Sequence, residues 1–269
     1  QPAVSQHIRW LEQKYGTKLF QYNGKQLKLT EAGEMLRSAA LTARHDQKIL
    51  ESRMALQKET GRHLSFGATR TIGDFLMPKI LKTFLARFPD TEVKMLVENT
   101  DMLLRFLDGG QIDFAVVEGI FPRKEYDAVC FARENYIAVC GSGSRRLTEC
   151  RRMEELLGER ILVREEGSGT RRILEMGLEN GNLTLDDFAG RIEAGSLHVL
   201  KELAEAGFGV AFLYEAAAEE ELREGRLLKI PLEDFVDSHD FTFLWRRGSL
   251  YAEEYREICR QWKQELVSE

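Results

Sequence analysis

The sequence lacks several features that whole classes of proteins require. No apolar run approaches the roughly 20 residues of a membrane-spanning helix, so we do not expect the chain to span or bind a membrane. Only five prolines occur in 269 residues, which leaves no proline-rich linker. The four cysteines, Cys130, Cys140, Cys150 and Cys259, have neither CxxC spacing nor a paired histidine. This disfavours a zinc site or a redox pair and is typical of reduced thiols in a cytoplasmic protein.

Catalytic and nucleotide-binding motifs are missing as well. The sequence contains no GxSxG, GxxxxGK[ST] or HExxH motif, and no GxGxxG follows a predicted strand. The Gly-Ser-Gly run at residues 167–169 lacks the lysine that a phosphate-transfer loop needs. We therefore predict that the chain is not an enzyme, binds no cofactor, and has no catalytic or metal-binding residues.

The composition that is present is globular, but its charge is uneven. Apolar residues make up 43% and charged residues 30%, and the length favours about two domains. The net charge is −6, yet residues 1–60 carry +4 and the remainder −10. The basic excess lies in residues 1–30, which hold five lysines and arginines against one glutamate. This suggests a small module that meets a polyanion, with chance clustering on a solvated face as the alternative.

Residues 1–12 predict a helix. Val4, Ile8 and Leu11 recur at helical spacing and form an apolar stripe, and Pro2 suits a first turn. The side chains off this stripe are short and polar, which suits a helix that reads base edges, although a plain surface helix would show the same pattern. Gly16 is a plausible stop for this helix.

A hairpin is predicted next. Asn23-Gly24 stands between two short apolar-bearing runs, residues 19–22 and 26–29, and such a pair is a strong signal for a two-residue turn. A helix followed by a basic hairpin is the layout of a winged helix. In that layout Lys25 and Lys28 would lie against phosphates.

A long helix is predicted from residue 31 to about residue 60. Thr30 can cap it, and Glu31 and Glu34 are favourable near the positive end of its dipole. Residues along one side repeat with heptad spacing, which implies pairing with a second copy or domain, with packing on the chain's own body as the alternative. These residues are Leu36, Ala40, Ala43, Gln47, Leu50 and Met54.

From residue 62 onward, short strands alternate with amphipathic helices, which predicts an α/β fold with mostly parallel sheets. We expect strands at residues 64–68, 93–97, 114–117, 160–163, near 192, 209–213 and 241–245, and helices at 75–88, 100–109, 170–180, 196–205 and 252–267. Thr100 can cap the second of these helices. Two such sets, bridged by residues 131–139, suggest two lobes. The last strand and helix would return to complete the first lobe.

Motifs in both parts resemble one family, the LysR-type transcriptional regulators. The first part carries QPAVSQHIRWLEQKYGTKLF and LTEAGEML, followed by the long helix. The body carries, in the expected order, GATRTIGDFLMPKILKTFLARFPDTEV, GGQIDFAVVEG, REEGSGTR and AEAGFGVAFL. The resemblance implies a winged helix-turn-helix, a dimerising linker helix and a two-lobed effector domain like a periplasmic binding protein.

The resemblance also implies a division of the chain. Residues 1–30 would be a partial winged helix-turn-helix, 31–60 the linker helix, and 61–269 the effector-binding domain. Lobe I of that domain would comprise residues 61–134 and 238–269, and lobe II residues 135–237. Relative to the family pattern, the first helix and most of the second are absent ahead of Gln1, and Tyr22 stands where an arginine is usual.

Site residues for DNA follow from the same resemblance. The helix would face the major groove of double-stranded DNA, and Lys25 and Lys28 would hold the backbone, with the protein acting as a dimer or tetramer. The groove-facing residues would be Pro2, Ala3, Ser5, Gln6 and Arg9.

A ligand site is predicted where strands end and helices begin, because ligands of open α/β sheets bind beyond the carboxyl ends of strands. Hydroxyls, glycines and exposed N–H groups gather there, which indicates a small anionic effector between the lobes; the alternative is that these residues only cap helices. A transport-type solute-binding protein would share this body but needs neither the basic helix and hairpin nor the heptad seam. The candidates are Thr69, Arg70, Thr71, Asn99, Thr100, Arg164, Gly167, Ser168, Gly169, Thr170 and Ser196.

Overall fold

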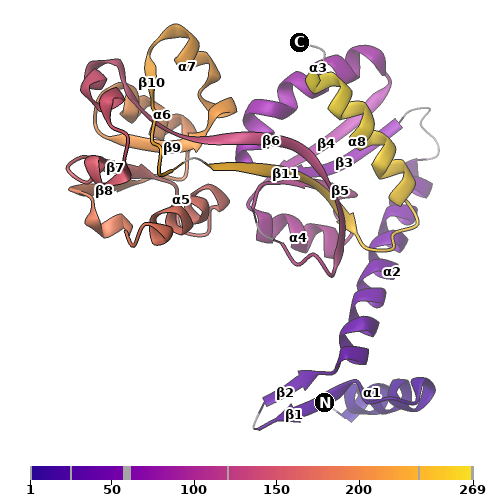
Figure 1. The fold of residues 1–269 in the computed structure, drawn as a ribbon. Coiled ribbons are helices and arrows are strands. Elements are labelled where there is room, and N and C mark those ends of the chain that lie inside the picture. Colours follow the sequence, from indigo (N-terminus) through magenta and orange to yellow (C-terminus); the bar gives the residue numbers. More distant parts are fainter. Residues whose placement is uncertain (1, 25, 57–61, 120, 236, 268–269) are drawn as a thin grey trace.

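The computed structural model of the chain describes residues 2–24, 26–56, 62–119, 121–235 and 237–267. A small N-terminal unit is joined by one long helix to a body of two lobes (Figure 1). The predicted α/β class of the body is confirmed, and so is the sequence of a helix, a hairpin and a long helix ahead of it.

The N-terminal unit consists of α1 (Pro2–Tyr15), which ends before Gly16 as predicted, and a hairpin of β1 (Phe20–Asn23) and β2 (Gln26–Leu29). The prediction that Asn23 is a turn residue is wrong, because Asn23 belongs to β1 and pairs with Gln26 in the ladder. Gly24 has the positive φ, 64°, that a two-residue hairpin turn requires.

The long helix α2 spans Glu31–Leu56, and the predicted continuation through residues 57–60 lies outside the described residues. Thr30 caps it as expected, because its Oγ1 accepts a hydrogen bond from the Gly33 amide at 3.0 Å. Gly33 has a packing role that its position in the first turn did not suggest. A Cβ there would lie 2.1 Å from the carbonyl oxygen of Leu19, so the hairpin can pack on α2 only if this residue is glycine.

The body contains one hydrogen-bonded sheet in the order β4-β3-β5-β11-β6-β9-β7-β8, with β10 paired to β6. Its strands are β3 (Arg62–Ala68), β4 (Thr91–Val97), β5 (Phe114–Val117), β6 (Tyr126–Gly141), β7 (Arg160–Val163), β8 (Gly190–Glu193), β9 (Val210–Tyr214), β10 (Leu227–Ile230) and β11 (Asp237–Arg246).

The expectation of mostly parallel strands holds only within each lobe. In what we call lobe I, β3 pairs in parallel with β4 and β5, and in lobe II β7 pairs in parallel with β8 and β9. Every pairing of β6 and β11 is antiparallel, because these two strands carry the chain between the lobes in opposite directions. The predicted bridge at residues 131–139 lies within β6, and Tyr136 pairs both with Asp237 of β11 and with Tyr214 of β9.

Helices cover this sheet on its faces (Figure 1). The predicted helix at 75–88 begins earlier, with a π-helical turn at Ile72–Leu76, and continues as α3 (Met77–Arg87). Strand β10 and helix α7 were not expected from the sequence. The remaining helices are α4 (Thr100–Asp108), α5 (Gly169–Asn180), α6 (Leu197–Glu205), α7 (Glu219–Glu224) and α8 (Ala252–Val267), with short 3-10 turns at Ser142–Glu149, Met153–Leu156, Leu185–Asp187 and Glu215–Ala217.

Stacked aromatic rings form the core of lobe I. Phe114 of β5 stacks on Phe66 of β3 and Phe243 of β11, with ring centroids 5.4 and 4.5 Å apart. Trp262 of α8 meets Phe66 edge-on at 4.8 Å. The last strand and helix of the chain are therefore part of lobe I and are buried against its first strands.

Candidate functional site

The first candidate surface lies on α1. Ala3, Ser5, Gln6 and Arg9 are all exposed, whereas the side chain of Pro2 is not described. The apolar stripe is only partly covered: Ile8 and Leu11 are half-buried, but Val4 is 62% exposed. Four of the five predicted groove-facing side chains are thus accessible to a partner.

The hairpin carries the second predicted contact. Lys28 is exposed on β2, and Lys25 lies outside the described residues. Sequence reasoning did not anticipate that Glu12 would engage another lysine of this unit. Its carboxylate accepts hydrogen bonds from Lys18 Nζ at 2.7 Å and from the Leu19 amide at 3.0 Å, and the Lys18 hydrogen bond is the main cause of its lowered pKa. Glu12 thereby fixes the segment between α1 and β1.

Helix α2 has two different faces. Thr42, His45, Asp46 and Ile49 are buried against lobe I. On the heptad seam Leu36 is half-buried and the other five predicted members are exposed. Packing on the chain's own body, the alternative considered above, therefore does occur, but it uses a face separate from the seam.

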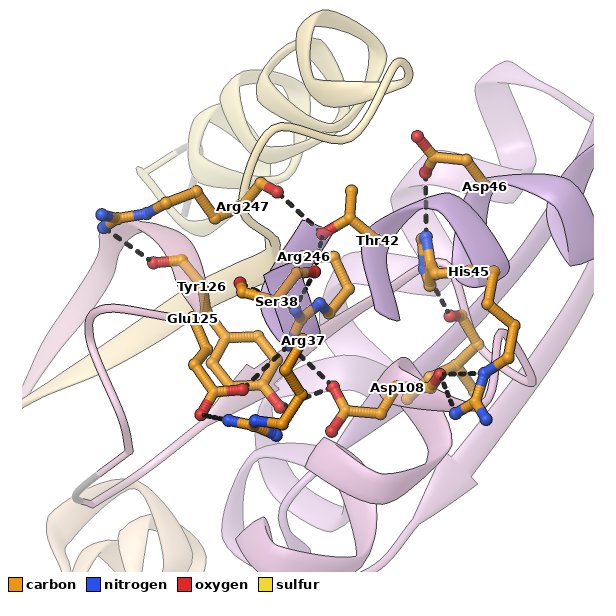
Figure 2. Close-up of polar contacts among 12 residues, drawn as sticks. Arg37, Ser38, Thr42, His45, Asp46, Asp108, Glu125, Tyr126, Arg246 and Arg247 are labelled. Atoms are coloured by element: carbon orange, nitrogen blue, oxygen red, sulfur yellow. Dashed lines mark hydrogen bonds and ion pairs between the residues drawn. The ribbon is translucent and has the colours of Figure 1, made fainter. Parts of the chain in front are cut away.

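Polar side chains hold the buried face of α2 to lobe I (Figure 2). Thr42 Oγ1 donates a hydrogen bond to the Arg247 carbonyl at 3.0 Å. Asp46 accepts from Ser249 Oγ at 2.7 Å and from the Leu250 amide at 2.8 Å. His45 lies between the Asp46 carboxylate, 3.0 Å from its Nδ1, and the Ile112 carbonyl, 3.3 Å from its Nε2.

Arg246, at the end of β11, is the centre of this junction and has no exposed surface. Its Nη1 donates to Asp108 Oδ1 at 2.9 Å and lies 3.3 Å from Glu125 Oε2, while its Nη2 donates to the Ser38 carbonyl at 3.1 Å. A buried guanidinium with three such partners fixes the orientation of α2 on lobe I. In the sequence this face is marked by a second repeat with heptad spacing, offset from the seam. Its members are Thr42, Asp46, Ile49 and Arg53.

A groove of about 1570 Å³ opens beside the junction. It lies between α2 and the loops at residues 122–125 and 247–251. Apolar side chains along it include Met35, Leu50 and Leu250, the last of which is 86% exposed. The groove is therefore continuous with the exposed seam.

The second candidate site is the cleft between the lobes, where the strand-end segments meet. A cavity of only about 10 Å³ there is lined by seven of the eleven predicted effector residues, from both lobes: Thr69, Arg70, Asn99, Thr100, Arg164, Ser168 and Gly169. Gly167 lines an adjoining cavity of about 760 Å³. Ser196 lies apart, with Arg70, in a third cavity of about 270 Å³.

The two remaining candidates, Thr71 and Thr170, contact a residue that sequence reasoning missed. Glu118 directly follows β5, and its Oε1 accepts hydrogen bonds from both threonine hydroxyls at 3.2 Å. Thr71 belongs to lobe I and Thr170 to lobe II, so this carboxyl group joins the lobes. The strand-end rule that selected the other candidates, applied to β5, would have found it.

The backbone of Glu118 is held as well. Its amide donates to Thr69 Oγ1 at 3.3 Å, and its carbonyl accepts from Thr100 Oγ1 at 3.1 Å. Gly169, the first residue of α5, lies against this carbonyl group: a Cβ there would be 3.4 Å from the oxygen, in ordinary van der Waals contact. Glu118 is thus the point on which the cleft segments converge.

Burial dominates the electrostatics of Glu118. It raises the pKa of this carboxyl to about 7, against the opposing influence of the Thr71 and Thr170 hydrogen bonds and of the Arg164 charge. The nearest buried cation, Arg164, is engaged by Glu165, with two hydrogen bonds of 2.8 and 2.9 Å. Oε2 of Glu118 is buried and has no hydrogen-bond partner in the part of the chain that the structure describes.

Some of the predicted ligand residues are helix caps, and others are not. The side chain of Asn99 caps α4 by accepting from the Met102 amide at 2.9 Å, so the prediction that Thr100 caps this helix is wrong. Ser196 caps α6 in the same way. Thr100 is instead turned toward Glu118, and Ser168 precedes α5 without a side-chain cap bond. The cap alternative thus accounts for Asn99 and Ser196 only.

Among the described residues, no group of three or more histidines, cysteines, aspartates and glutamates is arranged to hold a metal ion. None of the helices in the described ranges is long and apolar enough to cross a membrane.

Comparison with known proteins connects these sites to a family. Residues 57–264 match the LysR substrate binding domain, and residues 1–34 match the bacterial regulatory helix-turn-helix of the lysR family. The RuBisCO operon transcriptional regulator of Allochromatium vinosum is 28% identical over 258 residues, covering 92% of this chain and 82% of that protein. The probable RuBisCO transcriptional regulator of Gracilaria tenuistipitata var. liui is 30% identical over 239 residues, covering 84% and 75%.

Solved structures show the same fold. A hydrogen-peroxide-bound OxyR mutant of Corynebacterium glutamicum superposes with a TM-score of 0.67 at 20% identity, over 99% of this chain and 84% of that one. The regulatory domain of Synechocystis CcmR, in complex with 2-PG, gives 0.64 at 18% identity, over 73% and 95%. At these identities the likeness concerns the fold alone.

Proposed function

This chain belongs to the LysR family of bacterial transcriptional regulators, and from that premise we propose that it binds promoter DNA as a dimer or tetramer and responds to a small anionic effector held between its lobes. One observation carries the effector assignment: strand-end segments of both lobes meet at a cavity of about 760 Å³, and the small cavity that holds Arg70 and Arg164 shares Thr100, Ser168 and Gly169 with it. The start of α5 has no side-chain cap bond, and the backbone amides of such a helix start, together with Arg70, favour an anion there.

The class of anion is suggested by similar proteins. The CcmR regulatory domain has been solved with 2-PG bound, and two relatives are named as RuBisCO regulators. We propose that the effector of this chain is a comparably small molecule with a phosphate or carboxylate group, held by backbone amides at the start of α5 and by the Ser168 hydroxyl.

The N-terminal unit is proposed to contact DNA. Gln6 and Arg9 would reach base edges from α1, and Lys28 would hold a phosphate from the hairpin, together with Pro2, Ala3, Ser5 and Lys25. The exposed seam of α2 would pair with that of a second copy, because its apolar members are otherwise left in water. The domain limits given above, at residues 30 and 60, are part of this proposal, and so is the division between the lobes.

The cleft and α2 are connected through paired strands and one side-chain hydrogen bond. Glu118 follows β5, which pairs with β11 through Val117 and Thr242. β11 ends at Arg246, which is hydrogen-bonded to the Ser38 carbonyl on α2. A ligand that moves the lobes would therefore move the linker helices and the spacing of the two α1 helices. Coupling of this kind amounts to about 1–3 kcal/mol in typical allosteric proteins.

We further propose that the protein acts in the cytoplasm and has no catalytic activity. The transport-type alternative is not favoured, because residues 1–34 match a DNA-binding domain that a transport protein does not need.

The experiment that tests this function is a thermal-shift and DNA-mobility assay on the full-length protein with sulfate, phosphate, oxalate and 2-PG. At least one anion should raise the melting temperature and alter promoter affinity, since a ligand stabilises the state that it binds by RT ln(1 + [L]/Kd). Thr170→Ala should reduce the shift, because the Thr170 hydroxyl holds the Glu118 carboxyl in place in the cleft. Thr83→Ala, at an exposed threonine on α3, should not. No shift with any of these anions would overturn the effector assignment, and no affinity for promoter fragments would overturn the regulator assignment.

A further inference from the structure

A carboxyl group, that of Glu118, lies where the segments of both lobes converge on the proposed anion site. Glu118 is 3% exposed and lines both the small cleft cavity and the larger cavity beside it. The cleft hydroxyls of Thr71 and Thr170 both donate to its Oε1. A hydroxyl has one proton to donate, so neither threonine can donate to a bound anion while it holds Glu118.

The ionised form of Glu118 would oppose an anion in this cleft. Like charges in a buried site repel strongly, and the charged groups around Glu118 do little to offset its charge. Arg164 is the cation that acts on its pKa, and Arg164 is engaged by Glu165. Apart from Glu118, the two cavities are lined by six acidic groups and six arginines, so their lining offers no net positive charge. These groups are Arg70, Glu98, Asp101, Arg123, Arg133, Arg164, Glu165, Glu166, Arg171, Arg172, Glu175 and Asp240, together with His239.

The neutral form changes the role of the carboxyl group. Because Oε1 accepts two hydroxyl hydrogen bonds, the acidic proton belongs on Oε2. Oε2 is buried and has no hydrogen-bond partner within the described residues. An unsatisfied buried donor is unfavourable, and an oxygen of an incoming ligand would satisfy it.

We propose that Glu118 binds the effector as a neutral acid, donating a hydrogen bond from Oε2 to an oxygen of the effector's anionic group, so that binding takes up one proton. This rests on the proposed anionic effector and adds the chemistry of the contact. The ligand group must present an acceptor oxygen without a proton, as sulfate, a carboxylate or a phosphate dianion does. Glu118 gains one proton from solvent before or during binding and keeps it while the effector is bound.

Burial places the titration of Glu118 in a useful range. Its pKa is raised to about 7, so the carboxyl is largely neutral at pH 6 and largely ionised at pH 8.5. If only the neutral form binds, affinity should be about 30-fold weaker at pH 8.5 than at pH 6.

The test is calorimetric titration of the full-length protein with sulfate and with oxalate, whose charges are constant between pH 6 and 8.5. Repeating each titration in buffers of different ionisation enthalpy measures the protons taken up. We expect each binding event to take up about one proton at pH 8.5 and almost none at pH 6, and we expect the 30-fold change in affinity.

Glu118→Gln is the informative variant, because glutamine has the shape of the neutral acid. Its carbonyl can accept from Thr71 and Thr170 while its amide donates to the ligand. The variant should bind both anions with an affinity that changes less than about twofold over this pH range and with no proton uptake. Should the variant fold poorly, the proton count of the unaltered protein remains a sufficient test.

Three results would overturn the proposal: anion affinity of the unaltered protein that is independent of pH, proton uptake that persists in Glu118→Gln, or loss of binding in that variant while the unaltered protein binds. None of these three results contradicts the assignment of an anionic effector to the cleft. If neither protein binds either anion at any pH, the proton-linked contact and the effector assignment both fail, whereas the DNA-binding part is judged by the mobility assay.

Discussion

Arg246 donates a hydrogen bond from Nη2 to the backbone carbonyl of Ser38, 3.1 Å away, and so joins the end of β11 to the linker helix. Its other terminal nitrogen is committed to Asp108 of lobe I at 2.9 Å. One buried side chain therefore connects the body to the element that leads to the N-terminal unit (Figure 2).

Replacing Arg246 by methionine should destabilise the protein by about 1.5–3 kcal/mol, because its charged hydrogen bonds to Asp108 and to the Ser38 carbonyl would be lost. Glu125 would keep its contact with Arg37. Urea unfolding measures this. Arg247→Ala is the matched control: this neighbouring side chain is about half exposed, and its loss should cost less than about 1 kcal/mol. Equal effects of the two substitutions would contradict the role given to Arg246.

Asp113 should make stability depend on pH. Burial is the main cause that raises its pKa from 3.8 to about 7, with Arg53 opposing. Between about pH 4 and 7 the unfolded chain has released this proton and the folded chain has kept it, so the free energy of unfolding falls as pH rises, by up to about 4 kcal/mol.

Asp113→Asn should flatten that decrease, because asparagine resembles the neutral acid. Urea unfolding at pH 5 and 7.5 measures the change, and Asp74→Asn, at an exposed position, should leave it unaltered. Glu118, whose pKa is also raised, lowers stability with rising pH in both the unaltered protein and the variant. The difference between their pH dependences is therefore due to Asp113. An identical pH dependence in the variant would show that Asp113 titrates at its ordinary value.

The exposed seam of α2 should hold two copies together. Leu50→Glu removes about 1.5–3 kcal/mol of apolar burial from each copy and adds a charge, which should weaken the dimer by at least about tenfold. Sedimentation over a concentration series measures this. Ser52→Glu places the same charge off the seam and should leave the dimer intact.

Lys28 should contribute a non-specific contact to DNA. Lys28→Ala should lower affinity for all sequences alike and reduce the slope of log affinity against log salt by about 0.9 per lost phosphate contact. Fluorescence anisotropy at several salt concentrations measures the slope. The control is Lys229→Ala in lobe II, which should change neither quantity.

Gln6 should contribute to sequence discrimination. Gln6→Ala should cost about 1–3 kcal/mol on the preferred operator and much less on unrelated DNA, because a base contact is lost rather than a backbone contact. Competition binding on the two DNAs measures this, with the exposed Gln13→Ala as control. An equal loss of affinity on both DNAs would show that Gln6 contacts the DNA backbone and not a base.

Local signals predicted the elements of this chain well. Thr30 starts α2 where expected, and the alternation of strands and helices recurs within a few residues of its predicted positions. These features depend on side chains that are close in sequence. The antiparallel pairing of β6 and β11 could not be predicted in the same way, because it depends on where the chain crosses between lobes.

The candidate site shows the same division. Strand-end rules found most of the cleft residues, but the partners of Glu118 lie 47 and 52 residues away along the chain. Its burial and its raised pKa arise only when β5, the start of the first body helix and α5 are brought together. The cap of α4 was misplaced by one residue because Asn99 and Thr100 can both serve, and only the contact with Glu118 engages Thr100 elsewhere.

The paired strands β6 and β11 limit how the cleft can open. Their register is continuous from Tyr126 to Tyr136 apart from one irregularity at Phe241/Thr242, so pulling the lobes straight apart or sliding them would break a ladder of hydrogen bonds. A two-stranded ribbon yields far more readily to twisting, which leaves that ladder intact. The lobes should therefore respond to a ligand by rotating relative to each other about the axis of this ribbon. A small rotation at the cleft would become a large displacement at the far end of α2.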